Sequence, residues 1–149
     1  LSAAERKLIQ QRGCGMVHCP SSNLFLHSGR FPAELWSNYP KLSLGSDVGA
    51  GPSFSMFDVM RDAYYVNMMP LSRLFYLATL GGAKTLGLEN TIGSLQTGKQ
   101  ADFSVIRLSD IQVPGSEELL YDLIFKWDQR EILQVYVGGQ KVWPLPGSS

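Results

Sequence analysis

The segment from Leu42 to Gly51 places a carboxylate between a short apolar strand and a glycine-rich turn. Leu42 and Leu44 would share one face of that strand, and Asp47 follows at its end. The glycines after Asp47 let the backbone turn sharply and approach a ligand closely. In barrels of parallel strands, acids at the carboxyl ends of strands usually take part in chemistry. An aspartate that only forms a turn or caps a helix is the simpler alternative, and the spacing alone favours it.

The composition is that of a folded domain without a charge bias. The chain has 149 residues, 44% of them hydrophobic, which is enough for one core of ordinary size. The 13 basic and 13 acidic residues balance, and no basic run is interleaved with aromatic residues, so we expect no nucleic-acid partner. Only two cysteines occur, Cys14 and Cys19, which is typical of reduced thiols in the cytoplasm rather than of a disulfide framework.

The sequence shows neither a membrane span nor the core of a signal peptide. No apolar run approaches the ~18 residues that cross a bilayer, and residues 1–7 lack an apolar centre. We therefore expect no membrane partner. Because Leu1 is not an initiator methionine, we also expect this chain to be a piece of a longer protein.

The first part of the chain predicts helices and short strands in alternation. A capping box at Ser2 and Glu5 begins a helix to Gln11 that Gly13 closes. The next expected elements are a buried strand at 16–19, a loop at 20–40 with a short helix near 32–36, and a strand at 42–44. Two apolar strands joined by about twenty residues suit a parallel crossover.

Two amphipathic helices are expected next. Ser53 or Ser55 can cap the first, whose apolar residues recur at helical spacing as Met56, Val59, Met60, Ala63 and Tyr64. The second follows the same spacing through Leu71, Leu74, Phe75 and Ala78. We expect Gly81 and Gly82 to interrupt it, with a short helical turn to Leu88.

After Asn90 the pattern changes to short strands separated by glycines. Gly138 and Gly139 predict the two-residue turn of a hairpin. The expected elements are strands at 92–95 and 103–106, a helix near 117–126, hairpin strands at 133–137 and 140–143, and a tail at 144–149. A small antiparallel β unit would therefore end the chain.

A local metal site is one candidate for chemistry, built from Cys14, His18, Cys19 and His27. Neighbouring residues on a strand point to opposite faces, so His18 and Cys19 could not both bind one ion. His18 alone is more often a hydrogen-bonded residue near a strand end than a ligand, although the carboxyl end of a parallel strand faces a pocket, which keeps His18 as a candidate. The residue geometry thus disfavours this site.

The residues around Asp47 have the partial spacing of two further motifs. Residues 45–49 have the spacing of a nucleophile elbow, but both histidines precede Asp47, which is the wrong order for that triad. The nearby glycines are not a dinucleotide fingerprint, because Phe54 stands where a glycine or alanine is needed. Neither a metal-free hydrolase triad nor a nucleotide cofactor is supported.

Several segments in order resemble one known family. Residues 18–24 look like a seventh-strand motif, and residues 44–51 with 53–56 look like an eighth. Residues 77–83 look like the helix that follows, and residues 92–103 look like the return into a small β domain. Together these segments resemble the C-terminal third of the guanine deaminase family, zinc hydrolases of the amidohydrolase superfamily.

The resemblance implies an α/β fold with two parts. Residues 1–90 would form the last two strands and helices of a TIM-type (β/α)8 barrel, and hence a partial barrel. Residues 91–149 would form part of a small β-sandwich domain. The remainder of the barrel would be the partner of this portion, and the full-length protein would be a homodimer.

The resemblance also implies a reaction and a site. A zinc-activated water would hydrolyse guanine to xanthine and ammonia, with Asp47 as the carboxylate that binds zinc and takes a proton from the water. The family's other ligands would lie before Leu1, and His18 and His27 do not occupy their positions. We therefore expect this chain alone to be inactive. A non-catalytic fragment or isoform, or another deaminase or hydrolase of the superfamily, is the alternative.

Overall fold

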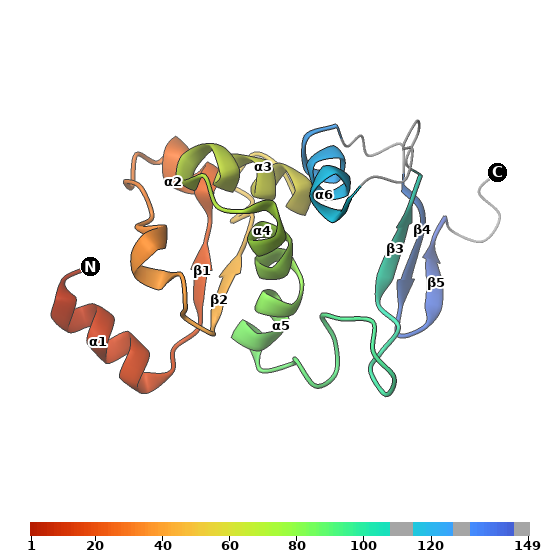
Figure 1. The fold of residues 1–149 in the computed structure, drawn as a ribbon, viewed down its shortest axis with the longest axis horizontal. Helices are drawn as coiled ribbons and strands as arrows, with labels where there is room; N and C mark the ends of the chain where they lie inside the picture. The colour runs from red at the N-terminus through yellow and green to blue at the C-terminus, as the bar shows by residue number, and fades with distance from the viewer. Residues whose placement is uncertain (108–114, 127–131, 145–149) are drawn as a thin grey trace.

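The computed structural model describes residues 1–107, 115–126 and 132–144, and it has a mixed α/β fold (Figure 1). A parallel pair of strands forms early in the chain and an antiparallel sheet forms late, with helices between them. Within these described ranges, every helix is too short or too polar to pass through a bilayer.

The first sheet pairs β1 (Met16–His18) with β2 (Leu42–Leu44) in parallel, which confirms the expected crossover. Met16 lies opposite Leu42, and His18 lies opposite Leu44. All three residues of β2 are buried, so this strand is covered on both faces. Because the strands are parallel, the segments that leave their carboxyl ends start at the same edge.

α1 (Ala3–Arg12) begins and ends as the sequence predicts. The Ser2 hydroxyl accepts the Glu5 N–H at 3.3 Å, and the Glu5 carboxylate accepts the Ser2 N–H at 2.6 Å. These two bonds form the capping box. Gly13 ends the helix with a φ of 61°. Local capping rather than burial defines this helix, since none of its residues is buried.

The segment after β1 is a helix, α2 (Pro20–Phe25), so the prediction of a loop was wrong here. Pro20 stands in the first turn, where its fixed φ and missing N–H are compatible with a helix. Pro20 and Ser22 are buried. This burial outweighs the turn preference of the serines and asparagine at 21–23. The short helix expected near 32–36 is present as the 3₁₀ helix η1 (Ala33–Trp36).

Three helices follow β2: α3 (Met56–Asn67), α4 (Leu71–Ala78) and α5 (Leu80–Leu86). The Ser55 hydroxyl caps α3 by accepting a backbone N–H of its first turn. The break between α4 and α5 lies at Thr79, so the prediction of a break at Gly81 and Gly82 was wrong. A Cβ at Gly81 would come 3.0 Å from the Leu42 carbonyl oxygen. This glycine therefore lets α5 approach β2 closely.

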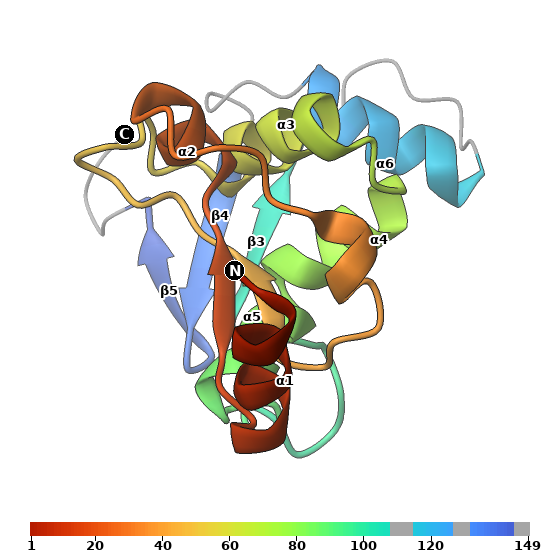
Figure 2. The same cartoon turned by 90° about the vertical axis from the view of Figure 1, so that its left-hand side faces the viewer.

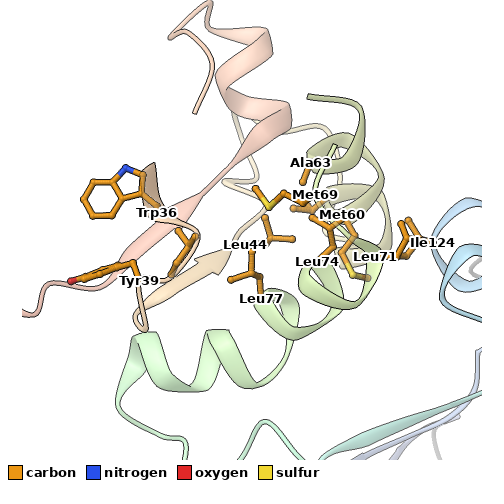
Figure 3. Packing of buried hydrophobic residues seen from close by; sticks show 12 residues of the cluster. Trp36, Tyr39, Leu44, Met60, Ala63, Met69, Leu71, Leu74, Leu77 and Ile124 are labelled. Carbon is orange, nitrogen blue, oxygen red and sulfur yellow. The ribbon is translucent and has the colours of Figure 1, made fainter. Parts of the chain in front are cut away.

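The hydrophobic core lies between β2 and these helices (Figure 3). The apolar stripe predicted for residues 56–64 is confirmed, because its members are either buried or packed against the core. The other core elements contribute Trp36, Tyr39, Leu42, Leu44, Leu71, Leu74, Leu77 and Ile124. A single core therefore collects residues from strands, helices and the connection between β1 and β2.

The second sheet is antiparallel, in the order β3 (Phe103–Ile106), β4 (Ile132–Val137), β5 (Gln140–Trp143). Gly138 and Gly139, with φ values of 58° and 77°, form the turn of the predicted hairpin. The rings of Phe103 and Tyr136 stack across β3 and β4 with centroids 4.5 Å apart. Of the predicted tail, only Pro144 lies within the described residues.

Residues 92–95 do not form the strand that the sequence predicts. The Ile92 N–H donates to the Leu88 carbonyl oxygen at 3.0 Å, and Gly93 has a φ of 90°. The chain therefore turns locally here, and the Ile92 N–H finds its acceptor within the same turn rather than on another strand.

α6 (Ser116–Phe125) confirms the helix predicted near 117–126 and contacts α3 and α4 (Figures 1 and 2). Ile124 is buried in the core, and the ring centroids of Phe125 and Tyr64 are 5.2 Å apart. A helix from the later part of the chain thus completes the core of the earlier part.

Candidate functional site

Asp47 lies in a tight turn after β2, beyond the carboxyl end of that strand. Its φ of 47° is in the left-handed region, which residues other than glycine seldom adopt. Its carbonyl oxygen accepts the N–H groups of Ala50 at 3.1 Å and Gly51 at 2.7 Å. A Cβ at Gly51 would lie 2.0 Å from the Ser46 carbonyl oxygen, so only glycine fits. The turn therefore fixes the backbone of Asp47.

The carboxylate of Asp47 is exposed and is held on one side by a serine. Ser22 Oγ donates a hydrogen bond of 2.6 Å to Asp47 Oδ2. Ser22 belongs to α2, which follows β1, so the parallel pair brings these two residues together. Within the described part of the chain, no donor reaches Oδ1. One carboxylate oxygen is fixed and the other is available to a ligand.

His18, the last residue of β1, is buried in a hydrogen-bond network. Asn67 Nδ2 donates to the Phe31 carbonyl oxygen at 2.7 Å, and Asn67 Oδ1 lies 3.0 Å from His18 Nε2. Nε2 must therefore carry the donated proton. Nδ1 is then an acceptor, and it has no hydrogen-bond partner among the described residues. The imidazole also stacks on Phe31, with centroids 4.6 Å apart.

Burial sets the charge of His18. Removal from water lowers its pKa to about 4, and the hydrogen bond to Asn67 opposes this effect only in part. The imidazole is neutral near pH 7. The structure thus confirms the interpretation of His18 as a hydrogen-bonded residue at a strand end.

A cavity of about 550 Å³ lies beside this network. His18 and Phe31 line it together with Tyr65 and the exposed His27, but Asp47 does not. Neither histidine makes a hydrogen bond to Asp47 in the described ranges. The structure brings Asp47 together with Ser22 and not with His18 or His27.

In the ranges that the structure describes, no three His, Cys, Asp or Glu side chains are grouped so that they could hold a metal ion. Cys14 is an exposed free thiol. Cys19 is also a free thiol, and it lies at the N-cap of α2 rather than in the strand where the sequence places it. Burial, with a smaller effect of the Asp47 charge, raises the pKa of Cys19. Cys19 is therefore held as a thiol rather than as a thiolate ligand.

Asp47 could supply one of the ligands of a zinc site. A carboxylate oxygen can be a zinc ligand, and Asp47 is an exposed residue whose Oδ1 has no donor among the described residues. Catalytic zinc needs about three protein ligands, so a zinc ion bound by Asp47 would need further ligands from outside the described residues of this chain. The chemistry that Asp47 can supply is metal binding or proton transfer.

Sequence reasoning missed the role of the serines at 21 and 22, which it placed in a loop. Each of these hydroxyls binds a carboxylate on another element, Ser21 to Asp62 and Ser22 to Asp47. The available signal was a proline followed by small polar residues directly after a strand, because that order can also begin a helix.

Known proteins resemble this chain over almost its full length. The model of the amidohydrolase family matches residues 1–142. Guanine deaminase from Homo sapiens is 36% identical over 171 residues, covering 99% of this chain and 38% of the human protein. The chain therefore spans well under half the length of that relative.

Solved structures extend the likeness to the fold. Guanine deaminase from Escherichia coli superposes with a TM-score of 0.88 at 33% identity, covering 96% of this chain and 37% of that chain. A zinc-bound adenosine deaminase from Xanthomonas campestris gives a TM-score of 0.82 at 32% identity, covering 95% of this chain and 34% of that chain. The extent of the family match, together with the shared fold, shows that this chain belongs to the amidohydrolase family.

Proposed function

We propose that this chain is the C-terminal portion of a guanine deaminase, which hydrolyses guanine to xanthine and ammonia. The identity to the human enzyme and the likeness in fold to the Escherichia coli enzyme support the substrate. The observation that carries the site is the exposed carboxylate of Asp47, with one oxygen held by Ser22 and the other free of donors in the described chain. Such a carboxylate beyond the end of a parallel strand suits metal-assisted hydrolysis.

Asp47 has two roles in this proposal. Its carboxylate would hold zinc together with ligands from the remainder of the protein, and it would accept a proton from the attacking water. Bound zinc supplies the acidity that makes this water nucleophilic near neutral pH. The fixed backbone turn and the hydrogen bond from Ser22 keep the carboxylate in one orientation. The water adds to the carbon that bears the amino group, and ammonia leaves.

The missing part of the active site belongs to a partner segment, the remainder of the barrel. β1 and β2 form a sheet of only two strands, and Val17 of β1 is 56% exposed. In this proposal the other strands of a TIM-type barrel pair with the open edges and cover Val17. Residues 91–149 supply part of a small β domain. The full-length protein is proposed to be a cytoplasmic homodimer.

A deaminase acting on a different purine is the second candidate. The likeness to the zinc-bound adenosine deaminase of Xanthomonas campestris, at a TM-score of 0.82, favours it. Comparing the turnover of guanine with that of adenosine in one preparation separates the two candidates. A non-catalytic fragment or isoform would turn over neither purine.

The test uses a chimera in which this chain replaces the C-terminal portion of the Escherichia coli enzyme. Asp47→Asn keeps the size and turn-forming ability of the side chain but removes its charge. We expect kcat for guanine to fall by about 10²–10⁴ and bound zinc to decrease. Kinetics, metal analysis and thermal unfolding are measured on the same preparation, and we expect the unfolding temperature to change little.

Asp102→Asn is the matched control, because Asp102 Oδ1 accepts the Gly138 N–H at 2.6 Å and serves the antiparallel hairpin. This variant should keep normal turnover. The chain by itself is the baseline, and it should neither deaminate guanine nor hold equimolar zinc, since one carboxylate is not a zinc site. A folded Asp47→Asn chimera with near-normal kcat would eliminate the catalytic assignment.

A further inference from the structure

Two adjacent serines of α2 donate hydrogen bonds to carboxylates on different elements. Ser21 Oγ donates to Asp62 Oδ2 on α3, whereas Ser22 Oγ donates to Asp47 Oδ2 in the turn after β2. Ser22 is 2% exposed, and Ser21 is half-buried. One serine therefore fastens α2 to α3, and the other fastens α2 to the carboxylate of the candidate site.

The bond from Ser22 controls the remaining freedom of Asp47. The backbone of Asp47 is already fixed by the N–H groups of Ala50 and Gly51, so its side-chain torsions are what can still vary. In the described chain Ser22 is the only side chain that donates to the Asp47 carboxylate. A hydroxyl bond of 2.6 Å to a carboxylate is short and charge-assisted. It holds Oδ2 and leaves Oδ1 for a ligand.

We propose that Ser22 is a positioning residue for Asp47. This inference rests on the proposed function of Asp47. Ser22 acts through Asp47, because its hydroxyl is buried and directed to Oδ2. Without the bond, the carboxylate would rotate among several staggered positions and bind zinc and accept a proton in only some of them.

If Ser22 had only a structural role, its removal should have a different effect. Its hydroxyl would only satisfy its own hydrogen-bonding need in a buried place, and its loss would lower stability without changing zinc affinity or turnover. Zinc affinity measured on folded protein therefore distinguishes the two roles.

The test compares three variants in the chimera described above. Ser22→Ala removes the bond to Asp47, Ser21→Ala removes the neighbouring bond to Asp62, and Ser22→Thr keeps a hydroxyl at position 22. Zinc retained against a competing chelator and kcat for guanine are measured on the folded fraction. We expect both to fall about 10–100-fold in Ser22→Ala, to stay near the parent values in Ser21→Ala, and to recover in part in Ser22→Thr.

A second measurement uses this chain without the chimera. The carboxyl ¹³C signal of Asp47 reports its hydrogen bond, so it should move in Ser22→Ala and stay in place in Ser21→Ala. An unmoved signal in Ser22→Ala overturns the inference, as do unchanged zinc affinity and kcat. Inactivity of Asp47→Asn with a normal Ser22→Ala would defeat this inference alone, whereas an active Asp47→Asn would defeat the proposed function.

Discussion

The parallel and antiparallel sheets of this chain differ in how far they are buried. All three residues of β2 are buried, and β1 ends in His18, which is 1% exposed. In β3 and β4 every residue is half-buried or exposed, and all four residues of β5 are exposed. The buried core comes from the parallel region, its connections and helices, with Ile124 of α6 added from the later part of the chain.

This difference shows where the fold can hold a site in a fixed geometry. The segments that follow two parallel strands begin at the same edge of the sheet. Ser22 follows β1 and Asp47 follows β2, so the two residues are hydrogen-bonded at that edge, beside buried strands that hold them in place. In the antiparallel hairpin, β4 and β5 are joined directly by the turn at Gly138 and Gly139. The carboxylate of Asp102 accepts the Gly138 N–H and therefore stabilises this turn. Substitutions should therefore have larger effects in the parallel region.

The largest expected effect is in the core beside β2. Leu74 on α4 is 0% exposed, so Leu74→Ala loses apolar contacts and leaves a cavity. We expect the free energy of unfolding to fall by about 2–5 kcal/mol. Val142 on β5 is 42% exposed, and Val142→Ala should lower the free energy of unfolding by less than about 1 kcal/mol. Denaturant unfolding measures both variants, and equal losses would break the comparison.

A pair of glycines gives the next effect. A Cβ at Gly51 would lie 2.0 Å from a backbone oxygen, so Gly51→Ala must displace the turn that holds Asp47. We expect the free energy of unfolding to fall by about 3 kcal/mol in this variant. A Cβ at Gly138 would meet open space, and the only strain would come from its left-handed φ of 58°. Gly138→Ala should therefore lower the free energy of unfolding by about 1 kcal/mol. Thermal unfolding of the two variants tests this order, and a larger loss at Gly138 would reverse it.

The smallest expected effect is the acid sensitivity of the parallel region. The pKa of His18 is about 4 when folded and 6.5 in its ordinary state, so the unfolded chain binds the proton first as the pH falls. The contribution of His18 to stability is complete above pH 6.5 and is lost as the pH falls toward 4. We expect the free energy of unfolding to decrease by about 2 kcal/mol between pH 7 and pH 5.

His18→Gln should remove this dependence on pH, and His27→Gln should preserve it because His27 is exposed. The measurement is denaturant unfolding of both variants and the parent chain at the two pH values. The same loss on acidification in His18→Gln would place the acid sensitivity in another group.

Local patterns predicted the elements whose partners are near in sequence. The caps at Ser2, Gly13 and Ser55 act within one helical turn, and the stripe over 56–64 follows from helical periodicity. α2 was missed because its small polar residues prefer turns, and what stabilises it is burial and contact with carboxylates far along the chain. The strand expected at 92–95 was wrong because a short apolar run does not reveal whether a partner strand exists.

The residues of the candidate site also differ in whether the sequence could single them out. Asp47 could be singled out from the order of strand, acid and glycine, although its catalytic role stays a proposal. Ser22 could not, because its bond to Asp47 joins residues 25 positions apart and depends on the pairing of β1 with β2. The preference of His18 for a hydrogen bond was predictable, whereas its partner Asn67 lies 49 positions away on α3.

The sequence by itself determined the parallel crossover, the helical faces, the glycine hairpin and the place of a carboxylate after a strand. Each of these depends on the spacing of residues that are close along the chain. Only the tertiary structure decided which oxygen of Asp47 is held, which nitrogen of His18 carries the proton, and why α2 is a helix. Those features depend on distances between segments that packing brings together, and such distances are not encoded in local spacing.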